Sequence, residues 1–88
     1  MVARTFNTIK TKNSFYTRYE LGEVTVTLND TVTFPDFVDD STIWQVAFFR
    51  KSNGVAVSCT TALNVATVTQ AGVLDEPCFY FAYGIKTE

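Results

Sequence analysis

The 88-residue sequence contains no histidine, and reactive side chains are scarce. Histidine is the commonest general base and the commonest metal ligand in proteins, so its absence removes every Ser-His and Cys-His nucleophile. Glycoside hydrolysis needs two carboxylates on opposite sides of the scissile bond. Asp75 and Glu76 are adjacent on an expected turn, so their side chains diverge and cannot flank that bond. The sequence therefore predicts a protein that is not an enzyme and that has no catalytic residues and no cofactor.

Cysteine and metal-ligating carboxylates are also in short supply. Asp36, Asp39 and Asp40 share a loop that could hold a hard cation, but the loop lacks the spacing and the glycine of an EF-hand, so we expect solvated acids and no metal. Only two cysteines occur, Cys59 and Cys78. A bridge between them is arithmetically possible, but the expected strand parity disfavours it, and we leave the disulfide open.

Charge is sparse and unevenly distributed. Charged residues make up 18% of the chain, against about 25% in a typical soluble domain, and the net charge is −2. Four basic residues and no acidic one precede Tyr19, whereas three basic and nine acidic residues follow from there onward. This asymmetry predicts a basic N-terminal arm or edge strand over residues 1–18 on a β-domain over residues 19–88. The acidic balance argues against a nucleic-acid partner.

Long apolar runs are absent as well. No stretch approaches the roughly 20 residues of a membrane span, and the opening MVARTFNTIK has no apolar segment of the signal-peptide type. We therefore expect a protein made in a cytoplasm that has neither a signal peptide nor a transmembrane segment and that binds no membrane.

What the sequence does have is period-two alternation of apolar and polar residues. Expected strands cover 23–28, 31–34, 44–51, 55–63, 64–70 and 77–86, with further candidates at 5–9 and 14–20, and no segment has helical periodicity. With 47% hydrophobic residues, the chain is long enough for one core. The pattern predicts an all-β fold: a small antiparallel β-sandwich, Ig-like or jelly-roll-like, or a compact barrel of six to eight short strands.

Asn53-Gly54 lies between two apolar runs and predicts a two-residue type I′ hairpin turn. That turn places Arg50 opposite Val57 and Phe48 opposite Cys59. The same register assigns one face of the hairpin to the core: Trp44, Val46, Phe48, Val55, Val57, Cys59 and Leu63.

The closing segment CFYFAYGI is apolar on both faces of an expected strand. We predict that Phe79, Phe81 and Tyr83 line the core. Tyr80 and Ala82 then point outward, where they would extend an apolar patch with Ile43, Ala47 and Phe49. Monomers rarely leave such a patch uncovered, so its cover is either the N-terminal segment folded back or another subunit.

A carbohydrate-binding module is the alternative class, since small β-sandwiches stack sugars on exposed aromatic rings. The single tryptophan, Trp44, falls on the expected core face. The remaining aromatic candidates are scattered along the sequence: Phe15, Tyr16, Tyr19, Phe49 and Tyr80.

Three segments together, IWQVAFFRKSNGVAVSC, NVATVTQAGV and CFYFAYG, are rich in Thr and Asn and thinly charged. Over roughly residues 42–85 they resemble small virion proteins of tailed bacteriophages, of the capsid decoration or cement type. The resemblance implies a homo-oligomer, often a trimer, that is located in the virion and binds the major capsid protein. No functional residue carries over from the resemblance. The interface candidates come from the basic arm and the expected apolar patch: Arg4, Lys10, Lys12, Arg18, Ile43, Phe49, Tyr80 and Ala82. The alternative is a carbohydrate- or surface-binding module of the tail, fibre or adhesin type.

Overall fold

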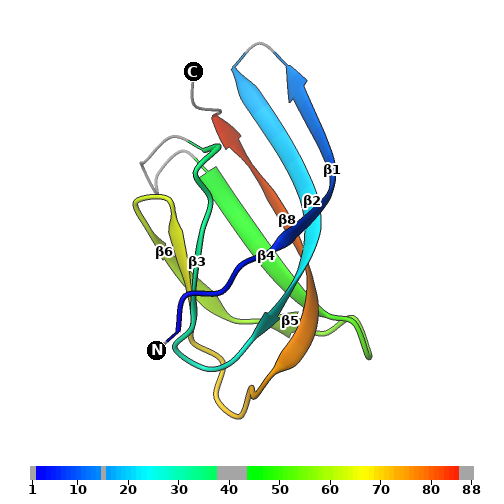
Figure 1. Ribbon diagram of the computed structural model, residues 1–88, viewed down its shortest axis with the longest axis vertical. Helices are drawn as coiled ribbons and strands as arrows, with labels where there is room; N and C mark the ends of the chain where they lie inside the picture. The colour runs from blue at the N-terminus through cyan, green and yellow to red at the C-terminus, as the bar shows by residue number, and fades with distance from the viewer. Residues whose placement is uncertain (1, 15, 38–43, 86–88) are drawn as a thin grey trace.

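The computed structural model describes residues 2–14, 16–37 and 44–85 and folds them into two antiparallel sheets packed face to face (Figure 1). A five-stranded sheet has the order β1-β2-β8-β4-β5, and a three-stranded sheet has the order β3-β7-β6. The strands are β1 (Asn7–Ser14), β2 (Thr17–Val26), β3 (Thr31–Thr33), β4 (Trp44–Arg50), β5 (Ala56–Val57), β6 (Cys59–Ala62), β7 (Val65–Val68) and β8 (Glu76–Ile85). The prediction of a small all-β sandwich is confirmed, with no helix among the described residues.

The core lies between the two sheets and is built from aromatic rings. Phe34 is at its centre: its ring lies 5.5 Å from Trp44, 5.3 Å from Tyr80 and 4.9 Å from Phe6, measured between centroids. Val24 and Val26 of β2 add the alternating apolar side chains that the sequence pattern predicted. Thus the three-stranded sheet covers one face of the five-stranded sheet.

The N-terminal segment closes one side of the sandwich instead of folding over its outer face. Residues 2–4 run parallel to β3, with Arg4 N–H donating to the Thr31 carbonyl at 2.8 Å and Thr31 N–H donating to Val2 at 2.9 Å. The chain then crosses to the other sheet, where it becomes the edge strand β1 (Figure 1). The boundary expected between residues 18 and 19 lies within β2, which starts at Thr17.

The Asn53-Gly54 hairpin forms, but with a register two residues away from the predicted one. Arg50 N–H donates to the Val55 carbonyl at 2.9 Å, so the loop has four residues, 51–54, and Phe48 lies opposite Val57. Within this loop only Gly54 has a positive φ, of 73°. The Asn53 side chain accepts a hydrogen bond from Val55 N–H, and the Asn53 backbone stays outside the left-handed region. A type I′ turn was therefore wrong.

A shift of two residues preserves which side chains share a face, so Trp44, Phe48 and Val57 are buried as predicted. The pairing ends early, however. Of the strand predicted at 55–63, only β5 pairs with β4. After β5 the chain crosses to the second sheet, where it forms β6 and pairs with β7. The expected pairs, Arg50–Val57 and Phe48–Cys59 included, are therefore wrong. Val55 and Leu63, which were assigned to the core, are exposed.

The predicted faces of β8 are inverted. Tyr80 and Ala82 are buried in the core, and Phe79, Phe81 and Tyr83 point outward. The physical reason lies across the sheet: Gly22 of β2 is the register partner of Tyr80, and its missing side chain leaves the space that the Tyr80 ring fills. A Cβ on Gly22 would lie well inside van der Waals contact with that ring and with the Asn7 carbonyl oxygen.

Phe48 and Phe49 provide a test of the two faces, because they are adjacent and differ in burial. Phe48→Ala should lower the free energy of unfolding by about 3–5 kcal/mol, since the ring is fully buried. Phe49→Ser should lower it by about 1 kcal/mol or less, because Phe49 is exposed. Urea unfolding of both variants measures the difference, and equal losses would contradict the assignment.

Gly22→Ala should destabilise the protein by about 1–3 kcal/mol or more, because the new methyl group overpacks the site under Tyr80. Gly54→Ala is the matched control. Its Cβ would meet no atom within 4 Å, so only the cost of the positive φ remains, about 1 kcal/mol. Thermal unfolding should rank Gly22→Ala below Gly54→Ala, and the reverse order would refute the packing of Tyr80 over Gly22.

Candidate functional site

The outer face of the five-stranded sheet carries a continuous set of exposed apolar side chains, which we call the aromatic face. It consists of Tyr19, Leu21, Phe49, Phe79, Phe81 and Tyr83. Each of these side chains is between 37% and 47% exposed. The five aromatic members together leave roughly 300–500 Å² of apolar surface in water, a size at which patches are often functional.

Register pairing across four strands builds this face. Directly opposed residues lie about 5 Å apart on the same side of a sheet, so three rows cross it. The rows are Lys12–Tyr19–Tyr83–Gln45, Lys10–Leu21–Phe81–Ala47 and Asn7–Glu23–Phe79–Phe49. β8 supplies the middle column, and every member of that column is aromatic.

The rings of the aromatic face contact one another. Tyr19 stacks on Tyr83 with 5.5 Å between centroids and an interplanar angle of 15°, and Tyr19 lies 6.1 Å from Phe81. Beside them, the small side chain of Ala47 leaves a shallow hollow of about 160 Å³ walled by Phe81 and Tyr83. A hollow of that volume suits one inserted apolar side chain.

One end of the aromatic face is closed by charge. The Lys51 ammonium lies 5.1 Å from the centroid of the Phe79 ring and is paired with the Glu23 carboxylate. This carboxylate also accepts a hydrogen bond from Asn7, and both bonds hold the pKa of Glu23 below its usual value. The apolar part that stays open therefore lies around Leu21, Phe81 and Tyr83.

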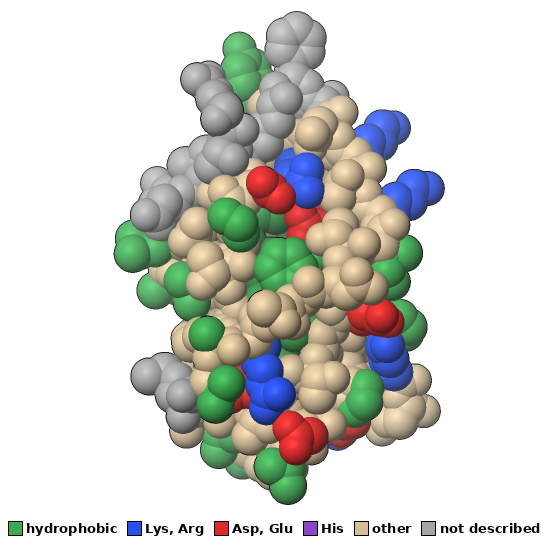
Figure 2. All heavy atoms as spheres, in the orientation of Figure 1, with side chains coloured by type: hydrophobic (Ala, Val, Ile, Leu, Met, Phe, Trp, Pro, Cys, Tyr) green, Lys and Arg blue, Asp and Glu red, His purple; other side chains and the backbone are tan. Residues whose placement is uncertain are grey.

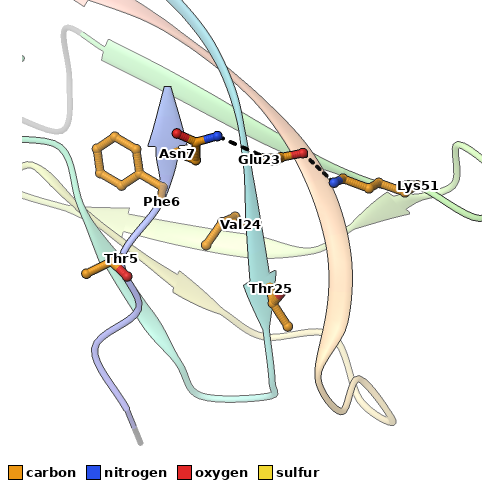
Figure 3. Close-up of a pocket in the computed structure, with 7 residues that line it drawn as sticks. All are labelled: Thr5, Phe6, Asn7, Glu23, Val24, Thr25 and Lys51. Carbon is orange, nitrogen blue, oxygen red and sulfur yellow. Dashed lines mark hydrogen bonds and ion pairs between the residues drawn. The ribbon is translucent and has the colours of Figure 1, made fainter. Parts of the chain in front are cut away.

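Behind this ion pair, a cavity of about 300 Å³ lies between residues 5–7 and β2 (Figure 3). It opens there because Asn7–Glu23 is the last pair of the β1–β2 ladder. The polar groups at its rim bond to one another, as the dashed lines from Glu23 to Asn7 and Lys51 show. With these groups already satisfied, the cavity presents no reactive arrangement.

A buried polar cluster joins β2 to β8, and no local pattern in the sequence predicts it. Glu20 is buried; its Oε2 accepts from the Tyr80 hydroxyl at 2.5 Å, and its Oε1 accepts from Arg18 Nη2 at 2.9 Å. Burial, together with the bond to Glu20, raises the pKa of Tyr80 well above its ordinary value. Because both Glu20 oxygens have partners, we assign the cluster a structural role: it holds Tyr80 inward.

A second ion-pair cluster anchors the N-terminal segment. Arg4 pairs with Asp30 at 2.5 Å and with Asp75 at 3.0 Å, and Asp30 also accepts the Thr27 and Val2 backbone N–H groups. Burial alone would raise the pKa of Asp30, but the Arg4 bond and these N–H donors outweigh it and leave the pKa below its usual value.

The interface candidates from the sequence separate into four groups. Arg4 and Arg18 are held in ion pairs within the chain, Arg18 with Glu20 and Asp36. Lys10 and Lys12 are exposed beside the aromatic face, and Phe49 belongs to it. Tyr80 and Ala82 were placed on the wrong face and lie in the core. Ile43 lies outside the described residues, as do Phe15, Asp39 and Asp40.

Neither cysteine forms a bridge: Cys59 and Cys78 are free thiols, and burial raises the pKa of both. Within residues 2–14, 16–37 and 44–85, no group of three or more Cys, Asp or Glu side chains is placed to bind a metal ion. No helix in that part of the chain has the length and apolar character of a membrane span. The absence of enzymatic activity stays a prediction.

Comparison with protein-family models, with curated proteins and with solved structures finds no match to this chain. Functional inference therefore rests on the aromatic face and its surroundings.

Asp30 makes the stability of the fold depend on pH. Because its folded-state pKa is below the value of about 3.9 expected when unfolded, its contribution is complete above about pH 4 and is lost as the pH falls through the folded-state pKa. Asp30→Asn should reduce stability at pH 7 and flatten the acid limb of the profile. Urea unfolding between about pH 2 and 7 measures both; an unchanged acid limb would show that Arg4–Asp30 does not stabilise the fold.

Proposed function

We propose that this chain is a structural assembly protein of the capsid-decoration type, which attaches to a larger protein lattice and to neighbouring subunits. The aromatic face carries this proposal. Six large apolar side chains are gathered on one sheet face, and no described segment of the chain covers them. Covering such a face with another protein surface removes it from water, which is the main favourable contribution to most protein association.

The sequence resemblance to small phage virion proteins supports the choice of lattice. That resemblance implies two kinds of partner, the major capsid protein and further copies of this chain. A rigid sheet is a suitable platform for this role, because an interface whose backbone is already ordered loses little conformational entropy on binding.

A carbohydrate-binding module is the second candidate, since the fold brings Tyr19, Phe49, Phe79, Phe81 and Tyr83 together on one face although they are scattered in sequence. The stacking of Tyr19 on Tyr83 argues against it, because each ring occupies one face of the other and that face is not free to stack on a sugar. Tyr80, which the sequence analysis named among the candidates for sugar stacking, is buried and cannot contact a sugar.

Phe81→Ser tests the proposal, with Leu63→Ser as the matched control. Both remove an exposed apolar side chain, but Leu63 lies in the turn between β6 and β7 of the other sheet. We expect the unaltered protein to form a defined oligomer in light scattering or to co-sediment with capsids of the virus that encodes it. Phe81→Ser should weaken that association about tenfold or more without changing thermal stability much, and Leu63→Ser should leave it unchanged.

A protein that stays monomeric and does not bind capsids would refute the assembly role. Association that Phe81→Ser does not weaken would also refute it. A glycan-dependent rise in melting temperature that Tyr83→Ala removes would establish the carbohydrate alternative instead.

A further inference from the structure

The carboxylates of the described residues are all engaged in ion pairs within the chain. Six of the nine acidic residues lie within the described part of the chain. Each of the six has a carboxylate oxygen within 3.5 Å of a side-chain nitrogen of Lys or Arg. The pairs are Arg4 with Asp30 and Asp75, Arg18 with Glu20 and Asp36, Arg50 with Glu76, and Lys51 with Glu23.

Two described cations have no such partner: Lys10 and Lys12 on β1 have no described carboxylate within ion-pair distance. The register places Lys10 opposite Leu21 and Lys12 opposite Tyr19, so both share the outer side of the sheet with the aromatic face. Basic side chains project into solvent along the edge formed by β1 in Figure 2. Among the described residues, the unpaired charge is therefore positive and lies on one side of the aromatic face.

Protection of the sheet edge gives a simpler reason for lysines on β1. Natural edge strands carry charges and bulges that prevent pairing with other chains, and β1 has a bulge between Thr8 and Lys10. Either sign of charge protects an edge, however, and only one sign complements a given partner. Charge reversal therefore separates the two roles.

We infer that the aromatic face docks onto a different protein that presents unpaired carboxylates along one side of an apolar protrusion. This inference rests on the proposed function and names the partner chemistry. An apolar side chain of the partner enters the hollow beside Ala47, and its carboxylates lie over Lys10 and Lys12. A second copy of this chain fits less well, because its described carboxylates are already paired. The charges on one side only also fix the orientation of docking.

The test uses a displayed library of a small three-helix scaffold with a randomised flat surface, selected on the immobilised full-length protein. Selected binders should combine apolar residues with Asp or Glu. Their affinity should fall about tenfold or more for the double variant K10E/K12E, and less for K10Q/K12Q, which removes the charge without reversing it. High salt should weaken binding to the unaltered protein, and F81S should abolish it.

Binders without acidic enrichment, or with equal affinity for K10E/K12E, would overturn the inference. Binding to vesicles of phosphatidylserine and phosphatidylcholine that F81S removes would also overturn it, in favour of a membrane surface. The inference would also be overturned if the protein forms an oligomer that F81S dissociates but binds neither capsids nor scaffold binders. That result would show that the aromatic face binds a second copy of this chain. If F81S abolishes capsid binding and K10E/K12E does not, the inference fails and the proposed function stands; if F81S has no effect on assembly, the proposed function fails.

Discussion

The inward orientation of Tyr80 is the constraint on which the rest of the structure depends. β8 is the central strand of the large sheet, paired with β2 on one side and with β4 on the other. Register partners share a face of the sheet, so the face on which Tyr80 lies determines which residues of β2 and β4 point into the core. Gly22 supplies the space for the ring, and Glu20 accepts its hydroxyl. Turning Tyr80 outward would remove this hydrogen bond and leave Oε2 of the buried Glu20 without its Tyr80 donor, while Oε1 stays paired with Arg18. Losing one partner of a buried charged group is unfavourable.

This orientation puts small residues inside and large ones outside. Besides Tyr80, the inner face of β8 has Cys78, Ala82 and Gly84, whereas the outer face has Phe79, Phe81 and Tyr83. The small inner residues are sufficient because the opposite layer and the N-terminal segment already fill the core with the rings of Phe34, Phe37 and Phe6. The three-stranded sheet covers one face only, so the largest apolar side chains of β8 stay accessible to another molecule.

The later strand positions followed from sequence because period-two alternation and turn residues are local signals. The N-terminal strands expected at 5–9, 14–20 and 23–28 were wrong in their bounds, since β1 runs from Asn7 to Ser14 and β2 is one strand from Thr17 to Val26. The closing strand, predicted at 77–86, runs from 76 to 85. The face of β8 did not follow, because both of its sides are apolar and the deciding residues, Gly22 and Glu20, lie more than 50 positions away. An apolar outer surface that includes Phe49 was predicted, and the structure has one. Tyr80 and Ala82 were assigned to that surface because the two faces of β8 were exchanged in the prediction.

The charge asymmetry of the sequence has a different meaning once the chain is folded. A basic start and an acidic body predicted a basic arm on an acidic domain, but Arg4 and Arg18 neutralise carboxylates of their own chain. There they anchor the N-terminal segment and complete the Glu20 cluster. Such pairs add little to attraction at a distance, since the two opposite charges largely cancel beyond their own separation and salt screens what remains. Within the described ranges, the lysines of β1 are the charged side chains that have no ion-pair partner. Their position beside exposed rings links the two features that a specific interface combines: apolar area for affinity and charge at its rim for orientation.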